Sequence, residues 1–143
     1  MSPRCGIVVV SHSTRLADGV VELATQMAPD VALRAAGGDD DGGLGTSMTK
    51  VEQALSATLD EAGEVVVATD LGSATMIAET ALELLAEEQQ SRVLLADGPL
   101  VEGVVAAAVA AQGGADAHGV RAALEAAADS FSRTAEPAGP DHA

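Results

Sequence analysis

The hydrophobic positions along this chain fall into two alternating patterns. Short, mainly apolar runs, rich in valine, indicate buried strands, and they occur at residues 7–10, 31–35, 65–69 and 93–96. Apolar residues spaced three or four positions apart, which indicate amphipathic helices, follow each run. The pattern therefore predicts four strands, each followed by a helix.

Capping and breaking residues give approximate helix boundaries. The first predicted helix follows Arg15 and ends before Pro29, and the second is capped by Thr46 or Ser47. Ser73 is expected to cap a helix that runs to about residue 88. Two further helices are predicted at residues 99–113 and from 116 to about 130. A glycine-rich and aspartate-rich loop at residues 36–45 separates the second strand from the second helix.

This alternation predicts an α/β fold with a single doubly wound, mostly parallel four-stranded sheet of the flavodoxin-like kind. Residues 1–131 are expected to form one domain. Residues 132–143, which contain two prolines and no periodic pattern, are expected to be a disordered tail.

Composition excludes several classes of protein. Among 143 residues, 22 are acidic and seven are basic, and the formal charge of -15 argues against partners that are nucleic acids or anionic membranes and favours basic docking surfaces. The single cysteine, Cys5, excludes an internal disulfide and a cysteine-based zinc site. No apolar stretch approaches the ~20 residues of a membrane helix, and a cytoplasmic protein is expected.

The chemistry of the chain is expected to lie at His12. This histidine follows the first buried strand directly, and ligands of open α/β sheets bind at the carboxyl ends of the strands. An imidazole accepts and releases charge near neutral pH. On placement alone, a reactive histidine and an ordinary loop residue are equally plausible.

A second segment strengthens the functional interpretation. Asp70 follows the third strand, which commonly neighbours the first, so its carboxylate could hold one imidazole nitrogen while the other attacks a phosphoryl group. Gly72 and Ser73 begin the next helix, whose free N–H groups suit a phosphate. The alternative for Asp70 is a simple helix cap.

The residues beside His12 are less decisive. Ser13 is expected to bind phosphate, and Ser11 and Thr14 are possible additional contacts, although each hydroxyl is equally well explained as a cap of the following helix. Arg15 is the only nearby cation. It could contact the phosphoryl group or a partner, or simply be solvated.

Several motifs taken together carry a family resemblance. Gly-Ile-Val-Val-Val-Ser-His-Ser-Thr-Arg at residues 6–15, Thr-Asp-Leu-Gly-Ser-Ala at 69–74, and Pro-Leu-Val-Glu-Gly at 99–103 resemble the mannose-type enzyme IIA family of the phosphotransferase system. The last motif is similar to the branch that serves phosphoenolpyruvate-dependent dihydroxyacetone kinase. The resemblance extends from Cys5 to about Ala128.

The resemblance implies a phosphoryl relay. The phosphocarrier protein of the phosphotransferase system would phosphorylate His12, whose imidazole Asp70 would orient. The phosphohistidine would then rephosphorylate ADP held on a nucleotide-binding kinase subunit, while a third subunit binds dihydroxyacetone. The chain would form a homodimer and would bind no metal or cofactor itself, because ADP or ATP and Mg²⁺ belong to the partner subunit.

Two other functions remain open at this point. A regulatory module could receive phosphate and report the state of the phosphotransferase system without passing the phosphate on. A small chelatase of the sirohydrochlorin type also has a histidine at its first strand end, but it needs further converging ligands, and no second histidine follows the third or fourth strand here.

Overall fold

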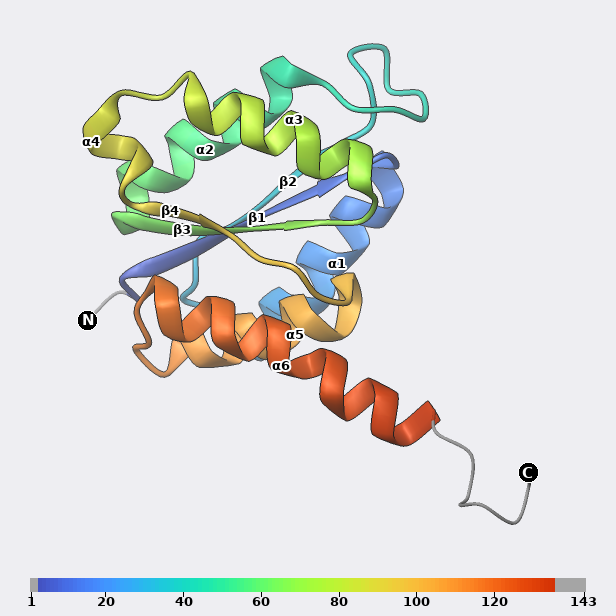
Figure 1. The fold of residues 1–143 in the computed structure, drawn as a ribbon, viewed down its shortest axis with the longest axis vertical. Coiled ribbons are helices and arrows are strands. Elements are labelled where there is room, and N and C mark those ends of the chain that lie inside the picture. Colours follow the sequence, from blue (N-terminus) through green and yellow to red (C-terminus); the bar gives the residue numbers. More distant parts are fainter. Residues whose placement is uncertain (1–2, 136–143) are drawn as a thin grey trace.

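The computed structural model describes residues 3–135, with side chains described for residues 3–129. Strands and helices alternate along the chain, as the hydrophobic pattern predicts (Figure 1). The elements are β1 (Cys5–Ser11), α1 (Thr14–Met27), β2 (Leu33–Gly37), α2 (Met48–Ala62), β3 (Glu64–Thr69), α3 (Gly72–Glu83), the short α4 (Glu87–Gln90), β4 (Val93–Leu95), α5 (Leu100–Gln112) and α6 (Ala117–Ala135).

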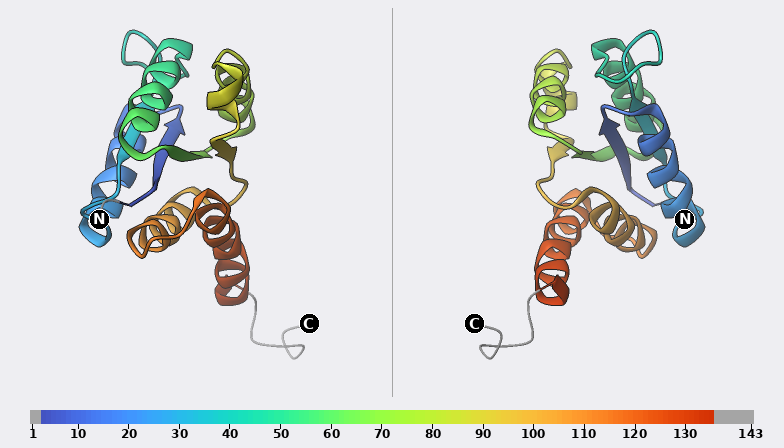
Figure 2. Two further views of the ribbon diagram at one scale, coloured as in Figure 1. Left: turned by 90° about the vertical axis from the view of Figure 1, so that its left-hand side faces the viewer. Right: turned by 90° about the vertical axis from the view of Figure 1, so that its right-hand side faces the viewer.

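The four strands form one parallel sheet in the order β2-β1-β3-β4, which confirms the predicted fold class. The central strand β1 is buried along its whole length, because helices cover both of its faces. Ile7 and Val9 point toward α1, α5 and α6, whereas Val8 and Val10 point toward α2 and α3. The two helical layers on either side of the sheet are visible in Figure 2. Both layers are packed almost entirely with aliphatic side chains.

Several boundaries differ from the sequence prediction. Strand β2 begins at Leu33 rather than at residue 31 and continues through Gly37, which pairs with Ser11. Helix α3 ends at Glu83 rather than near residue 88. Beyond this end, the side-chain amide of Gln90 donates to the carbonyls of Glu83 and Leu85, which backbone amides would accept as partners in a longer helix.

The C-terminal helix is longer than predicted. It continues through Ala135, and no proline or glycine occurs between residue 130, its predicted end, and Pro137. The remainder of the predicted tail, residues 136–143, lies outside the described residues. Among the residues that the structure describes, no helix combines the length and the apolar character needed to cross a bilayer.

Gly37, the last residue of β2, lies tightly against the first turn of α1. A Cβ atom at this position would lie 2.7 Å from the Ser13 carbonyl oxygen and 2.9 Å from the Thr14 Cα atom. We expect Gly37→Ala to lower the free energy of unfolding by about 1–3 kcal/mol, because the backbone of α1 must shift. Urea denaturation of the variant measures the change.

Gly19→Ala is the matched control, since a Cβ at that helical position meets no atom within 4 Å. Alanine there should leave stability unchanged or raise it by up to about 1 kcal/mol. Equal midpoints for Gly37→Ala and the parent chain would contradict the packing argument.

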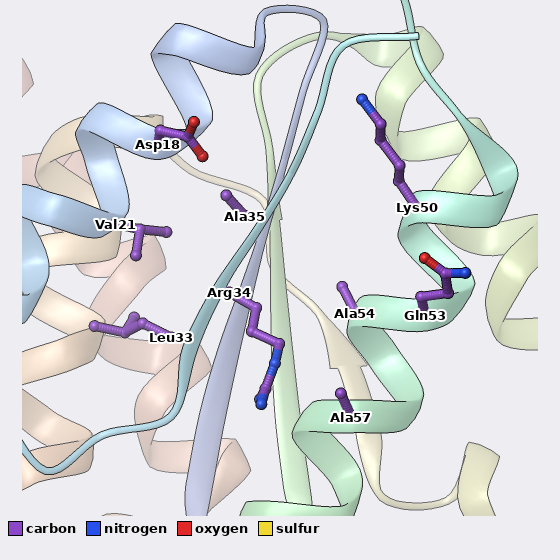
Figure 3. A pocket seen from close by; sticks show the side chains of 9 residues that line it. All are labelled: Asp18, Val21, Leu33, Arg34, Ala35, Lys50, Gln53, Ala54 and Ala57. Atoms are coloured by element: carbon purple, nitrogen blue, oxygen red, sulfur yellow. The ribbon is translucent and has the colours of Figure 1, made fainter. Parts of the chain in front are cut away.

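A hollow of about 520 Å³ runs along the outer edge of β2, between α1 and α2 (Figure 3). Its two cations are already engaged. Arg34 pairs with Glu61, and the Lys50 Nζ atom donates to the carbonyls of Gly37 and Asp39 at 3.1 and 2.8 Å. His12 is not among the residues that line this hollow, so the hollow is separate from the candidate site at His12.

Candidate active site

His12 lies in the tight connection between β1 and α1, and its backbone is held from two sides. Its N–H donates to the Oδ2 atom of Asp70 at 3.0 Å, and its carbonyl accepts from the N–H of Gly45 at 2.8 Å. These contacts place the imidazole at the carboxyl edge of the sheet. Its side chain is 24% exposed, enough to be reached from outside.

Asp70 follows β3, the neighbour of β1, and the predicted meeting with His12 occurs. The Asp70 Oδ1 atom lies 3.0 Å from the His12 Nδ1 atom, and Oδ2 accepts a hydrogen bond of 2.9 Å from the Ser11 hydroxyl. The Asp70 N–H donates to the Val10 carbonyl, which joins the end of β3 to β1. Both carboxylate oxygens are thus directed to the β1 end, and Asp70 is not the cap of α3.

The hydrogen bonds also favour the ionised form of Asp70. Burial raises the pKa of this carboxyl, but the hydrogen bonds from the His12 backbone, the His12 ring and the Ser11 hydroxyl outweigh burial and lower the pKa below its ordinary value. A carboxylate accepts hydrogen bonds only, so the proton of a neutral His12 ring lies on Nδ1. The lone pair is then on Nε2.

This pKa shift predicts an acid-dependent contribution to stability. Because the folded-state pKa of Asp70 is depressed, its stabilisation is fully present above the unfolded value of about 3.9 and is lost as pH falls below it. The difference in unfolding free energy between the parent chain and Asp70→Asn should therefore be constant above about pH 5 and shrink toward pH 3. Urea titrations of both proteins across this range test it, and a constant difference would rule it out.

The Nε2 atom faces the beginning of α3. The Ser73 hydroxyl lies 2.6 Å from it, and with the proton on Nδ1 this hydroxyl is the donor. The sequence prediction that Ser73 caps the helix is wrong: Ser73 is the second residue of α3, and the cap position belongs to Leu71, whose side chain makes no capping hydrogen bond.

The start of α3 therefore has unused hydrogen-bond donors near the Nε2 atom of His12. The amides of Ala74 and Thr75 donate to the Leu71 carbonyl, whereas those of Gly72 and Ser73 have no acceptor among the described residues. A Cβ atom on Gly72 would meet nothing within 4 Å, so the approach to these amides is open. An uncapped helix N-terminus with free amides is suited to an anion.

The residues around His12 divide into supports and exposed groups. Ser11 is fully buried and holds Asp70, while its oxygen accepts from the Ser13 N–H. The Ser13 hydroxyl caps α1 by accepting from Leu16, and the Thr14 hydroxyl donates to the Gly37 carbonyl. Arg15 is exposed on the first turn of α1. Of the three hydroxyl residues that could cap α1, only Ser13 does so, whereas the hydroxyls of Ser11 and Thr14 donate to other groups.

Two supporting residues were missed by the sequence analysis. Gly45 supplies the amide that holds the His12 carbonyl, and Lys50 ties down the preceding loop through the carbonyls of Gly37 and Asp39. In the same loop, the Asp39 side chain accepts from the amides of Asp41 and Gly43. Only the abundance of glycine and aspartate signalled this loop, and composition does not specify which amide meets His12.

The described part of the chain contains no group of three or more His, Cys, Asp or Glu side chains that could hold a metal ion. His12 meets a single carboxylate, and its other ring nitrogen meets a hydroxyl. The chelatase alternative therefore gains no support from this site, whereas a nucleophilic imidazole beside anion-binding amides fits a phosphoryl carrier.

Comparison with known proteins identifies the class. A family model described as the phosphotransferase system fructose IIA component, of the mannose type, matches residues 6–121. The chain belongs to this family of enzyme IIA proteins. Among solved structures, a mannose/sorbose-specific IIA subunit from Enterococcus faecalis has a TM-score of 0.57 at 20% identity, covering 98% of this chain and 96% of that one, and it supports the fold.

The more similar relatives are named for one system. The PEP-dependent dihydroxyacetone kinase phosphoryl donor subunit DhaM of Escherichia coli is 47% identical over 114 residues, which are 77% of this chain and 24% of that protein. A subunit of the same name from Listeria innocua is 38% identical and covers 78% and 86% of the two chains. In Lactococcus lactis, the subunit DhaM of a PTS-dependent dihydroxyacetone kinase is 34% identical and covers 84% and 93%. The match thus spans about a quarter of the Escherichia coli protein and most of the other two.

Proposed function

We propose that this chain is the phosphoryl-donor subunit of a phosphoenolpyruvate-dependent dihydroxyacetone kinase and that it carries the phosphoryl group on Nε2 of His12. One observation carries the proposal: Asp70 holds Nδ1 while Nε2 points to the uncapped start of α3. The names of the relatives that match nearly end to end support the choice of system.

In the proposed transfer, the Nε2 lone pair attacks the phosphorus of a phosphohistidine on the donor. A new P–N bond forms as the donor's P–N bond breaks, and the donor's ring, which carries a proton on its second nitrogen, leaves as a neutral imidazole. The ring of His12 becomes positively charged, and the Asp70 carboxylate stabilises that charge through Nδ1–H. The amides of Gly72 and Ser73, with the Ser73 hydroxyl, bind the phosphoryl oxygens.

Ser13 and Arg15 are secondary candidates for contact with the phosphoryl group. The Ser13 hydroxyl accepts one hydrogen bond as a cap and retains its own proton to donate.

The second transfer reverses the chemistry: a terminal phosphate oxygen of ADP attacks, the P–N bond to His12 breaks, and the ring returns to its neutral form.

The partners follow from this relay and are part of the proposal. The donor is the phosphocarrier protein of the phosphotransferase system, and the acceptor is ADP on the nucleotide-binding subunit, which also holds Mg²⁺. A third subunit binds dihydroxyacetone. We also propose a cytoplasmic location and a homodimer for the subunit. This chain then needs no cofactor of its own, because its imidazole supplies the only reacting group.

Reconstitution tests the function directly. Phosphoenolpyruvate, the first enzyme and the phosphocarrier protein should label the chain, and adding the ADP-bearing and dihydroxyacetone-binding subunits should release the label as dihydroxyacetone phosphate. Label that is never lost to these subunits would instead favour the regulatory module. Absence of label on the chain would refute both.

Gly72 allows a sharp test of the anion-binding amides. Proline is tolerated at the first residue of a helix, and Leu71 already has the extended backbone, φ -135° and ψ 163°, that a following proline requires. Gly72→Pro should therefore keep α3 but remove one N–H donor, and we expect phosphorylation to slow about 10²-fold.

Gly72→Ala retains the N–H and serves as the control. Single-turnover labelling by the phosphorylated carrier protein compares the two variants. If both variants react at the same rate, the Gly72 amide does not bind the phosphoryl group.

A further inference from the structure

Lys50 is the only lysine of the chain, and it holds backbone carbonyls rather than a carboxylate. Its Nζ atom donates to the carbonyl of Gly37 at 3.1 Å and to that of Asp39 at 2.8 Å. Among the described residues, no carboxylate pairs with this ammonium, although 22 of the 143 residues of the chain are acidic. A hydrogen bond from a charged donor is roughly twice as strong as one between neutral groups. The end of β2 and the loop that follows it are therefore anchored by a charge.

The anchored loop, residues 38–45, has a shape that its own chain sustains only in part. Three of its glycines have positive φ angles, which other residues rarely adopt: Gly38, Gly42 and Gly45. Asp39 organises the loop from inside, because its carboxylate accepts from the amides of Asp41 and Gly43. Glycine-rich backbone is also the most flexible, so the loop depends on anchors from outside.

The start of α2 holds this loop at two points. Lys50 binds the Asp39 carbonyl, and the Ser47 hydroxyl donates to the Asp40 carboxylate. The Ser47 oxygen also accepts from the Lys50 amide as the cap of α2, so both anchors belong to one turn of the chain. Loss of the Lys50 ammonium would thus loosen the loop without releasing it completely.

The far end of the loop reaches the reactive histidine. The N–H of Gly45 donates to the His12 carbonyl at 2.8 Å, whereas Asp70 holds the His12 N–H and Nδ1 from the β3 side. The two supports have different tasks: the carboxylate fixes the ring proton, and the loop fixes the backbone from which the ring projects. With the loop loosened, the proton would stay on Nδ1, but Nε2 would no longer be held in one direction relative to the start of α3.

We propose that Lys50 is a positioning residue of the phosphoryl-transfer site, which acts through the loop at residues 38–45 on the backbone of His12 and so on the direction of its Nε2 atom. The inference rests on the proposed function of His12. The Nζ atom contacts backbone carbonyls and no reacting group, so its effect falls on the rate of transfer and not on the affinity for the donor. Misplacement of a reacting atom by about 1 Å can slow a transfer about 10²-fold.

Chemical modification separates the charge of Lys50 from the length of its side chain. In Lys50→Cys, alkylation of the introduced thiol with 2-bromoethylamine restores an ammonium at the length of a lysine, and 1-iodopropane gives an uncharged side chain of the same length. Lys50 lines the hollow of about 520 Å³ beside β2, so both reagents can reach the position. Cys5 does not interfere, because burial raises the pKa of its thiol to about 12 and keeps it unreactive.

We expect the propyl form to be phosphorylated about 10- to 100-fold more slowly than the parent chain at saturating donor, with the KM for the donor unchanged. The aminoethyl form should recover most of the parental rate. Phosphoramidate, a small donor that needs no docking surface, should also react more slowly with the propyl form, once label on His12→Ala is subtracted. Nitrogen NMR should find the ring proton of His12 on Nδ1 in both forms.

Arg34→Cys with the same two adducts is the matched control. Arg34 lines the same hollow, but its guanidinium contacts Thr58 and Glu61 and not the loop. Its propyl form should lose stability to urea, as that of Lys50→Cys does, yet accept label at the parental rate. A merely structural role of Lys50 would make the two positions behave alike.

Each outcome supports or overturns the positioning role. Equal maximal rates for the propyl and aminoethyl forms overturn it while the proposed function stands. A raised KM at an unchanged maximal rate also overturns it and assigns the loop to contact with the donor. If Lys50→Cys does not fold, Lys50→Arg and Lys50→Gln give the same comparison of charged and uncharged side chains. Failure of the donor to label even the parent chain overturns the proposed function, whereas the phosphoramidate rates still decide the role of Lys50.

Discussion

Substitution of His12 by alanine should abolish phosphorylation of this chain. The imidazole supplies the only ring nitrogen at the described site, and Ser73, the nearest hydroxyl, lacks a base once the ring is gone. Radiolabel transferred from phosphoenolpyruvate through the first enzyme and the phosphocarrier protein measures the effect. On the parent chain, the label should be acid-labile and base-stable, as a phosphohistidine is.

His118→Ala is the matched control, because His118 is exposed at the start of α6, outside the site contacts described above. It should accept label at the parental rate. Stoichiometric label that persists on His12→Ala would place the phosphoryl group elsewhere and defeat the assignment.

Asp70→Asn should slow phosphoryl transfer by about 10⁴-fold, more than removal of the side chain altogether. Two donors, the His12 N–H and the Ser11 hydroxyl, converge on Oδ2, so the amide oxygen of an asparagine takes that position. Its NH₂ group then faces Nδ1 and forces the ring proton onto Nε2. The nucleophilic lone pair is lost from the reacting side, as for any histidine locked in the wrong tautomer.

Asp70→Ala provides the comparison. It removes the orienting carboxylate but imposes no tautomer, and we expect a loss of only about 10². Nitrogen NMR of the imidazole supplies a readout that a merely structural role would not move: Nδ1 should carry the proton in the parent chain and Nε2 in Asp70→Asn. Equal rates for the two variants would reduce Asp70 to a support of the loop.

The features that the sequence predicted well depend on strong local patterns. The valine-rich runs define β1 and β3 because a strand covered on both faces must be apolar throughout, and the parallel topology then brings His12 and Asp70 to one edge. The amphipathic pattern after Thr46 and Ser47 predicts that one of the two caps the second helix, and the structure assigns the cap to Ser47, whose hydroxyl accepts from the Lys50 amide.

The features that could not be predicted depend on contacts between distant segments. The sequence places Gly37 in a loop, yet it is the last residue of β2 and pairs with Ser11. Glycine is needed there because α1 passes too close for a side chain. Ser73 resembles a cap, but the cap position of α3 lies two residues earlier, at Leu71, and the Ser73 hydroxyl contacts His12 instead. The sequence offers Ser11 as a possible phosphate contact, but in the structure its side chain is fully buried and its hydroxyl donates to Asp70. In each case the residue type is informative, whereas its role is set by a tertiary neighbour.

The hydrogen bond between His12 and Asp70 joins residues 58 positions apart, across the β1 and β3 pair. For protein engineers, this means that the reactive imidazole is not a portable peptide tag. A segment containing residues 6–15 grafted onto another scaffold would bring the histidine without its carboxylate and without the open helix start. Any fragment that ends before β3 should likewise contain an ordinary, unselective imidazole.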